Sequence, residues 1–335
     1  MDLFPTEDHF EIFTLDPLQE DIPWEALGGG KILFERIQAG SEGEPGFYLI
    51  DLDNKTTRGF MLSGNPLQPS LSPDGQRIAC SMLTDLNSYL DIYIMNTDGT
   101  NCQPVYRGGY QDLHPTWMPG SSKIAYVGTQ QLGALYTITA KKNASDRLEI
   151  IKFHYFDNEN DWIIDPSGGF SASAGNHFTG VSYNKPEGVL MVTPGRGKDG
   201  VSVILPHRRE DGMYYESPCF SPDGETIALL AMEKEPDGFL GGLWKSLSVY
   251  TIKPGGEELT RIVQVPAYEK PGKWSEEHRR HEVSLCWSPD GNKILFTVPT
   301  QENACNIYAV NADGTGLIQV TRNGKAVDRY VSWSR

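Results

Sequence analysis

The sequence contains the same four-residue turn three times, and this repetition limits the possible folds more than any other feature. Ser-Pro-Asp-Gly occupies residues 72–75, 221–224 and 288–291, and each copy stands between two short apolar runs. Proline presets the backbone of a tight turn, aspartate caps it, and glycine accepts the positive φ that closes a hairpin. Each copy therefore predicts two short antiparallel strands joined by a tight turn.

A second pattern follows two of these hairpins. Residues 91–99 and 306–314 each contain an alternating apolar and polar strand that ends in an Asp-Gly turn. One repeat then consists of four antiparallel strands, which is the unit of a β-propeller blade. The repeats predict an all-β chain.

Weaker copies and two orphan strands predict the number of blades. Residues 115–126 and 181–192 hold degenerate hairpins, residues 330–334 are a first strand without a second, and residues 31–34 are a second strand without a first. We expect the two ends to pair, which closes the ring and removes its free edges. The count predicts a six-bladed propeller, and seven blades would suit the length but lack a seventh turn motif. Residues 1–27 are predicted as an N-terminal arm and residues 28–335 as one propeller domain.

These motifs carry a resemblance to a known family. Trp-Ser-Pro-Asp-Gly at 287–291, followed by Asn-Ile-Tyr-x-x-Asn-x-Asp-Gly-Thr at 306–315, resembles the repeat of TolB-type propellers. The resemblance covers nearly the whole chain from about residue 30 and is specific for the fold rather than for a function. TolB itself has a further N-terminal domain, whereas only about 27 residues precede the repeats here.

Charge and composition narrow the expected partners. The formal net charge is −15, opposite to the Lys- and Arg-rich surface that a phosphate backbone requires. No run approaches the roughly 18 to 20 apolar residues that span a bilayer, and residues 1–27 lack the pattern of a signal peptide. We expect a monomer without a nucleic-acid or membrane partner, located in the cytoplasm. Removal of a signal peptide would instead place it in the periplasm or outside the cell.

Loop lengths predict which face of the disc carries function. Turns between the first and second strands of a repeat, and between its third and fourth strands, share one face and are short. The other face receives the long connections, at roughly residues 38–46, 157–176, 194–200, 233–245 and 266–281. Long loops on a rigid scaffold often carry binding and catalytic residues, so we expect the working surface there.

The start of each first strand should open onto that face around the central channel. Alignment on Trp117, Phe220, Trp287 and Trp333 gathers polar and aromatic residues three to six positions before these anchors, together with Ser217 and Ser284. The resemblance implies that an acid at this place ties adjacent blades. The candidate ligand-binding set is Gln68, Asp112, His114, Tyr215, Glu216, His281, Glu282, Arg329 and Tyr330.

Two functions remain open from the sequence. The first is a binding module that holds a polar ligand or a protein partner at the loop-rich face and in the central funnel, because tyrosines and histidines beside carboxylates suit a stacked and hydrogen-bonded ligand. The second is an enzyme in the funnel, such as a metal-assisted lyase or hydrolase acting on a carbohydrate or another polar small molecule. A divalent metal ion would then use His114, His281 and Glu282, since imidazole and carboxylate suit several such ions. Oligogalacturonate lyase, which is similar in its repeat motifs and holds a metal with His and Gln, implies this alternative.

The five cysteines predict reduced, packed thiols. Four of them, Cys80, Cys219, Cys286 and Cys305, fall in predicted strands, the total is odd, and no CxxC spacing occurs. A thiol reagent should therefore react slowly with the native protein and find five groups after denaturation. A disulfide in the native protein would contradict this prediction and indicate an oxidising compartment.

Overall fold

Each Ser-Pro-Asp-Gly segment folds as the tight turn that its sequence predicts. In the computed structural model, the hydroxyl of Ser72 donates to Oδ1 of Asp74 (2.5 Å) and accepts from the amide of Arg77 (2.9 Å). Gly75 closes the turn at φ 65°, and its amide donates to the carbonyl of Ser72 at 2.8 Å. The copies at 221–224 and 288–291 form the same bonds, so one local sequence builds the same hairpin three times.

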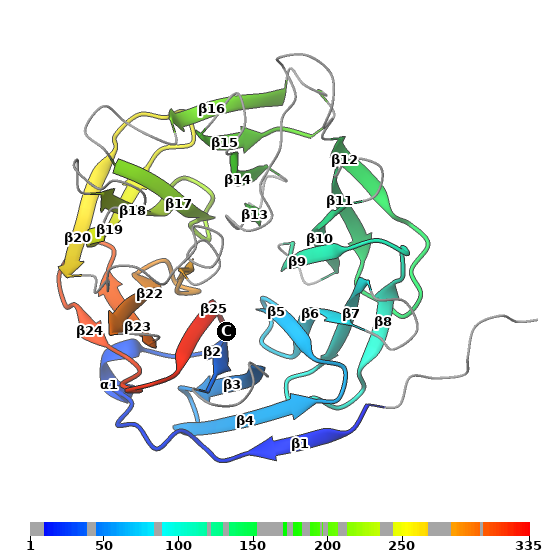
Figure 1. Cartoon of the computed structure of the whole chain (residues 1–335). Helices are drawn as coiled ribbons and strands as arrows, with labels where there is room; N and C mark the ends of the chain where they lie inside the picture. The colour runs from blue at the N-terminus through cyan, green and yellow to red at the C-terminus, as the bar shows by residue number, and fades with distance from the viewer. Residues whose placement is uncertain are drawn as a thin grey trace, which may run out of the picture.

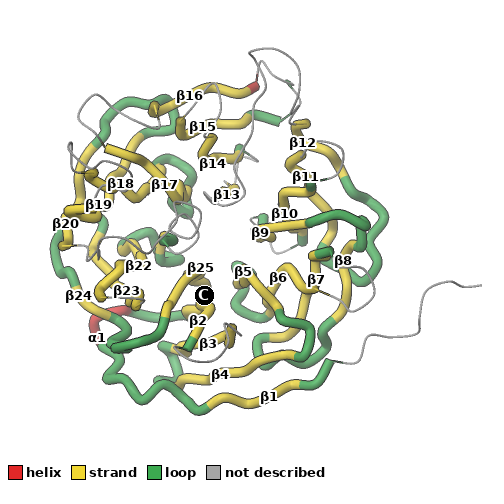
Figure 2. Tube along the Cα trace, viewed as in Figure 1, coloured by secondary structure: helices red, strands yellow, loops and turns green. Residues whose placement is uncertain are grey.

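The structure describes residues 10–38, 45–83, 89–118, 122–129, 134–152, 170–172, 177–182, 188–194, 196, 200–206, 213–234, 244–266, 283–301 and 304–335. Strands dominate these ranges and are arranged radially around an axis (Figures 1 and 2). The short helix α1 (Trp24–Leu27) precedes the first inner strands. Within the described ranges, no helix is long and apolar enough to cross a membrane.

Four blades stand as separate antiparallel sheets of four strands. The first contains β5 (Pro66–Leu71), β6 (Arg77–Leu83), β7 (Leu90–Asn96) and β8 (Gln103–Tyr106). The second contains β9 (Asp112–Trp117), β10 (Lys123–Gly128), β11 (Ala134–Thr139) and β12 (Leu148–Lys152). The third contains β13 (Phe170–Ala172), β14 (Phe178–Ser182), β15 (Gly188–Val192) and β16 (Val201–Pro206). The fourth contains β17 (Met213–Phe220), β18 (Ile227–Lys234), β19 (Trp244–Ile252) and β20 (Thr260–Pro266).

The other described strands form one nine-stranded sheet in the order β1-β4-β3-β2-β25-β23-β22-β21, with β24 beside β23. Its strands are β1 (Ile12–Leu15), β2 (Lys31–Ile37), β3 (Pro45–Asp51), β4 (Thr56–Leu62), β21 (Leu285–Trp287), β22 (Lys293–Gln301), β23 (Ala304–Asn311), β24 (Ile318–Gln319) and β25 (Val327–Ser334). Its two halves meet at one parallel bridge, between Cys305 and Val327. The predicted all-β propeller architecture is confirmed.

The last strand of the chain completes a sheet that the first strands begin. β25 pairs antiparallel with β2, with Trp333 opposite Ile32 and Ser332 opposite Leu33. The indole Nε1 of Trp333 donates to the carbonyl of Gly29 at 3.1 Å. The predicted pairing between the two ends of the chain is confirmed.

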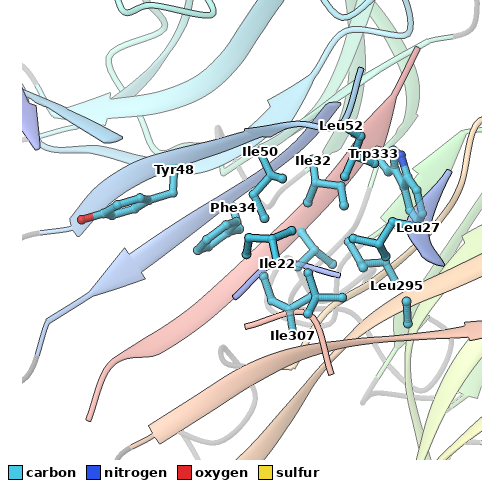
Figure 3. Close-up of a cluster of buried hydrophobic side chains, with 13 residues drawn as sticks. Ile22, Leu27, Ile32, Phe34, Tyr48, Ile50, Leu52, Leu295, Ile307 and Trp333 are labelled. Carbon is cyan, nitrogen blue, oxygen red and sulfur yellow. The ribbon is translucent and has the colours of Figure 1, made fainter. Parts of the chain in front are cut away.

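Apolar side chains fill the spaces between neighbouring sheets. Figure 3 shows the cluster between the closing strands and the β22–β23 pair, in which Ile32, Trp333 and Leu295 are almost fully buried. Ile22 and Leu27, which precede β2, complete this cluster with exposed fractions of 3% and 2%. The described part of the predicted arm is therefore packed onto the propeller, and β1 also pairs with the outer strand β4.

A chain that ends at Val327 should be strongly destabilised. It loses the pairing of β25 with β2 and reopens two sheet edges. It also loses Trp333, and truncation of a buried tryptophan alone costs about 3–5 kcal/mol. We expect the free energy of unfolding, measured by urea denaturation, to fall by at least about 3 kcal/mol.

Leu317→Ala is the matched control, because Leu317 is an exposed apolar residue near the same end of the chain. It should change the unfolding free energy by less than about 0.5 kcal/mol. An unchanged urea midpoint for the shortened chain would show that the end-to-end pairing does not hold the ring closed.

Candidate functional site

The innermost strands share a backbone irregularity at one position of the repeat. The pairing register shifts by β-bulges in β5, β9, β17 and β25. In each bulge a residue that is not glycine adopts a left-handed backbone: Gln68 (φ 57°), His114 (φ 51°), Ser217 (φ 51°) and Tyr330 (φ 54°). His114, Ser217 and Tyr330 lie three residues before the anchors Trp117, Phe220 and Trp333. Gln68 lies three residues before Leu71, which has the same place in its repeat, so the repeat builds the same bulge four times.

This conformation is costly and changes the direction of the side chain. A left-handed backbone costs an L-residue roughly 1–2 kcal/mol, and β-bulges commonly re-aim side chains near functional sites. Ser284 of the fifth aligned repeat occupies the same position before Trp287, and its Oγ accepts a hydrogen bond from the amide of Val331 at 3.1 Å. The bulge residues are therefore candidate site residues.

A cavity of about 400 Å³ lies at the centre of the ring. Its lining comes from the innermost strands β5, β9, β13, β17, β21 and β25, which surround the axis in Figure 1. The bulge residues Gln68, His114, Ser217 and Tyr330 line it together with Ser284. The lining then continues past the anchors to the Ser-Pro-Asp-Gly turns and Arg335, so the cavity extends from the bulges toward the face with short turns.

Gln68 and His114 form a fixed polar pair in this cavity. The side-chain oxygen of Gln68 accepts from the amide of His114 (2.8 Å) and from the hydroxyl of Ser81 (3.2 Å). Its Nε2 therefore faces Nε2 of His114, at 3.0 Å. An amide nitrogen can only donate, so this contact is a hydrogen bond when Nε2 of His114 accepts and the ring proton is on Nδ1.

Tyr330 supplies an aromatic wall beside this pair. Its ring meets the His114 ring edge-on, with centroids 5.8 Å apart at 62°. The guanidinium of Arg329 lies over the Tyr330 ring at 5.1 Å from its centroid. The Tyr330 ring thus contacts both an imidazole and a cation.

Arg329 does not line the cavity, but its ion pair with Glu35 supports residues that do. Its Nε and terminal nitrogen lie 2.7 and 2.6 Å from Oε1 of Glu35, a fully buried residue of β2. The other oxygen of Glu35 accepts from the amide of Gln68 at 3.0 Å. Burial raises the pKa of Glu35 while the charge of Arg329 acts to lower it. One partly buried ion pair therefore connects the strands that carry Tyr330 and Gln68.

Three other predicted site residues are described but do not line the cavity. Asp112 is 1% exposed, and burial raises its pKa to about 7, with the charge of Asp91 adding to the shift against that of Arg147. Tyr215 is equally buried, in the apolar cluster between the third and fourth sheets, edge-on to Tyr250. Glu216 directly precedes the bulge and is buried. The backbone turn at the bulge separates these residues from the cavity.

His281 and Glu282 lie outside the described residues. Among the residues that the structure does describe, no three His, Cys, Asp or Glu side chains form a group that could hold a metal ion. Of the nine predicted site residues, the structure brings Gln68, His114 and Tyr330 together at the cavity.

Comparisons with known proteins bear on the fold of the chain. No family model matches the sequence, and no curated protein matches it. The structure is similar to TolB from Acinetobacter baumannii with a TM-score of 0.61 and 14% identity, over 91% of this chain and 66% of that one, so this chain spans just under two thirds of that TolB. The chain has a TolB-like β-propeller fold.

Two further structures share the TolB-like fold. Hydrazine synthase from Kuenenia stuttgartiensis aligns with a TM-score of 0.56 and 12% identity, over 93% of this chain and 48% of that one. An oligogalacturonate lyase in complex with manganese aligns with a TM-score of 0.50 and 12% identity, over 94% and 85% of the two chains. At such identities the likeness shows the fold alone.

The sequence of this TolB-like propeller contains a signal for the bulges that the motif alignment missed. Proline follows the left-handed residue three times, at 69, 115 and 218. Inside a sheet, proline is confined to edges, first residues and bulges. Glu35 had no such signal, because it lies in β2 and reaches the site only through the closure of the ring.

The strain at the bulge can be measured at Ser217, because two substitutions remove the same hydroxyl. The Oγ of Ser217 donates to the carbonyl of Val283 at 3.0 Å, and both Ser217→Ala and Ser217→Gly lose this bond. Glycine adopts a positive φ without steric cost, whereas alanine does not. We expect the glycine variant to exceed the alanine variant in unfolding free energy by about 1 kcal/mol in urea denaturation. Equal stability of the two variants would show that the backbone at Ser217 is unstrained.

Proposed function

We propose that this TolB-like propeller is a binding module that holds a polar ligand in its central channel. The observation that carries the proposal is the cavity of about 400 Å³ lined by residues of four equivalent bulges. A polar small molecule suits the volume of this cavity better than a protein segment does. Sites for small molecules usually occupy about 300–1,000 Å³.

The side chains at the bulges favour an uncharged, hydroxyl-rich ligand. Gln68, Ser217 and Ser284 supply uncharged hydrogen-bonding groups, and His114 adds an imidazole. Tyr330 adds an aromatic edge against which a ring can pack. The charge of Arg329 is neutralised by Glu35. A neutral sugar or a similar polar ring matches this combination better than a strongly charged ligand does.

We further propose that the ring contains six blades. The nine-stranded sheet divides at its parallel Cys305–Val327 bridge into two antiparallel runs. One run is β25-β2-β3-β4, flanked by β1, and the other is β21-β22-β23-β24. With the four separate sheets, this division supplies six inner strands to the cavity wall, one for each blade.

A second candidate function is an enzyme with its site in the same channel. The imidazole of His114 beside the amide of Gln68 favours it, because the aligned oligogalacturonate lyase is described in complex with manganese. His281 and Glu282 would have to supply the remaining metal ligands in this case. Manganese-dependent turnover of a bound saccharide, lost in His114→Ala, would favour the enzyme over the binding module.

We also propose a monomer in a reducing compartment. All five cysteines are free thiols. Burial raises the pKa of Cys80 and of Cys286, which makes both thiols poor nucleophiles. Packed and unreactive thiols are typical of cytoplasmic proteins.

A thermal-shift screen with neutral sugars, amino acids and small organic acids tests the binding function. We expect a neutral sugar or a related polar ring to raise the melting temperature of the native protein. His114→Ala should bind such a ligand at least tenfold more weakly, because it loses a hydrogen-bonding group and a ring contact worth about 1.4 kcal/mol together.

Tyr110→Ala is the control, because Tyr110 is an exposed aromatic residue that does not line the cavity. Its affinity for the same ligand should equal that of the unsubstituted protein. If His114→Ala binds normally while keeping its fold, the channel is not the binding site and the long loops become the better candidate.

A further inference from the structure

Three inner strands line the cavity with a polar residue at one end and a proline at the other. In each of them the proline follows the bulge position by five residues. The pairs are Gln68 and Pro73, Ser217 and Pro222, and Ser284 and Pro289. All six residues belong to the cavity wall. The repeat therefore gives the cavity two chemically different ends, a polar end at the bulges and a proline end at the Ser-Pro-Asp-Gly turns.

The proline end presents apolar surface although its turns contain polar residues. The hydroxyl of Ser221 donates to Oδ1 of Asp223 at 2.5 Å and accepts from the amide of Thr226 at 3.0 Å. The other two turns bind their serine hydroxyls in the same way. Pro73 and Pro222 are exposed. Because the polar groups of each turn bind one another, the proline rings are the surface that a ligand can cover.

Small side chains separate the two ends. One residue from each inner strand lines the cavity between them, and none is larger than threonine: Ser70, Thr116, Ser171, Cys219, Cys286 and Ser332. The hydroxyls of Ser332 and Ser171 accept from backbone amides of the neighbouring sheets, at 3.0 and 3.2 Å. These short side chains, bound to the wall, leave the cavity continuous from one end to the other.

The two ends are too far apart for one sugar ring to fill. The anchor of a repeat follows its bulge residue by three positions, which at about 3.3 Å per residue separates them by roughly 10 Å. The proline lies two residues beyond the anchor. A single sugar ring hydrogen-bonded at the bulges would therefore leave the proline end unoccupied.

The charges near the proline end disfavour an anionic group there. Arg335 is the one residue in the described cavity wall whose side chain is permanently charged. Each of the three prolines is followed by an exposed aspartate, at positions 74, 223 and 290. Three carboxylates thus outnumber one guanidinium at this end. An uncharged apolar group suits these surroundings better than a phosphate or a carboxylate does.

We propose that the ligand of the channel is a neutral glycoside with an apolar aglycone. Its sugar would lie at the bulges, beside His114 and Tyr330, and its aglycone among the rings of Pro73, Pro222 and Pro289. This inference rests on the proposed binding of a polar ring in the channel and adds a second subsite to it. The apolar group would then lie toward the face with short turns.

Isothermal titration with the methyl and phenyl β-glycosides of glucose, galactose and mannose tests the second subsite. A phenyl ring covers more apolar surface than a methyl group, so the phenyl glycoside of the sugar that binds should bind at least about tenfold more tightly than its methyl glycoside. Replacing both exposed prolines, in Pro73→Ala/Pro222→Ala, should reduce this ratio to below about threefold. His114→Ala acts at the sugar end, and we expect it to weaken both glycosides by the same factor.

Pro254→Ala is the matched control for the loss of a turn proline. Pro254 has the same place in a tight turn, which the amide of Gly256 closes onto the carbonyl of Lys253 at 2.8 Å, but it does not line the cavity. This variant should keep the full ratio between the phenyl and methyl glycosides.

The outcomes distinguish the second subsite from the channel site itself. Equal affinities of the methyl and phenyl glycosides for the native protein would overturn the inference and leave the sugar site standing. A ratio that survives the loss of both prolines would also overturn it, because the phenyl group would then lie elsewhere. If none of these glycosides binds, the sugar-binding proposal on which the inference rests is itself contradicted.

Discussion

The structure depends on the pairing of β25, the last strand of the chain, with β2 near its beginning. Without this pairing, both strands would have an unpaired edge and the ring would be open. Their pairing joins residues about three hundred positions apart in the chain. It also brings Glu35 of β2 to Arg329 of β25, and the same carboxylate then holds the backbone of Gln68. The pairing that closes the ring therefore also positions residues of the cavity wall.

The cavity depends on backbone strain repeated by symmetry. Four residues in left-handed conformations carry a combined cost of several kcal/mol, which the paired strands on either side of each bulge must offset. The result is that Gln68, His114 and Tyr330 meet at the axis although they come from different sheets. A regular strand at these positions would direct its side chains alternately to the two faces of its sheet, and so into the spaces between sheets instead of toward the axis.

The repeat also shows how one position acquires different roles. Asp328 is saturated by Arg36, Thr321 and Asn323 and ties neighbouring strands together. Asp112 stands at the same place, but Gly128 lies opposite it, and the guanidinium beside it comes from Arg147. Arg147 lies over the Tyr126 and Tyr136 rings as Arg36 lies over the Phe34 and Tyr48 rings. The expectation that an acid here ties blades together holds for Asp328.

The sequence by itself determined the strand pattern, the tight turns and the pairing of its two ends, because proline, aspartate and glycine act locally and apolar alternation has a fixed period. It also pointed to Gln68, His114 and Tyr330, since the repeats align on their anchors. Only the tertiary structure decided that Glu216 is buried while its neighbour Ser217 lines the cavity, because a bulge between them turns the strand. Likewise, the contacts of Glu35 with Gln68 and Arg329 depend on which distant strands become neighbours, and no local pattern encodes that.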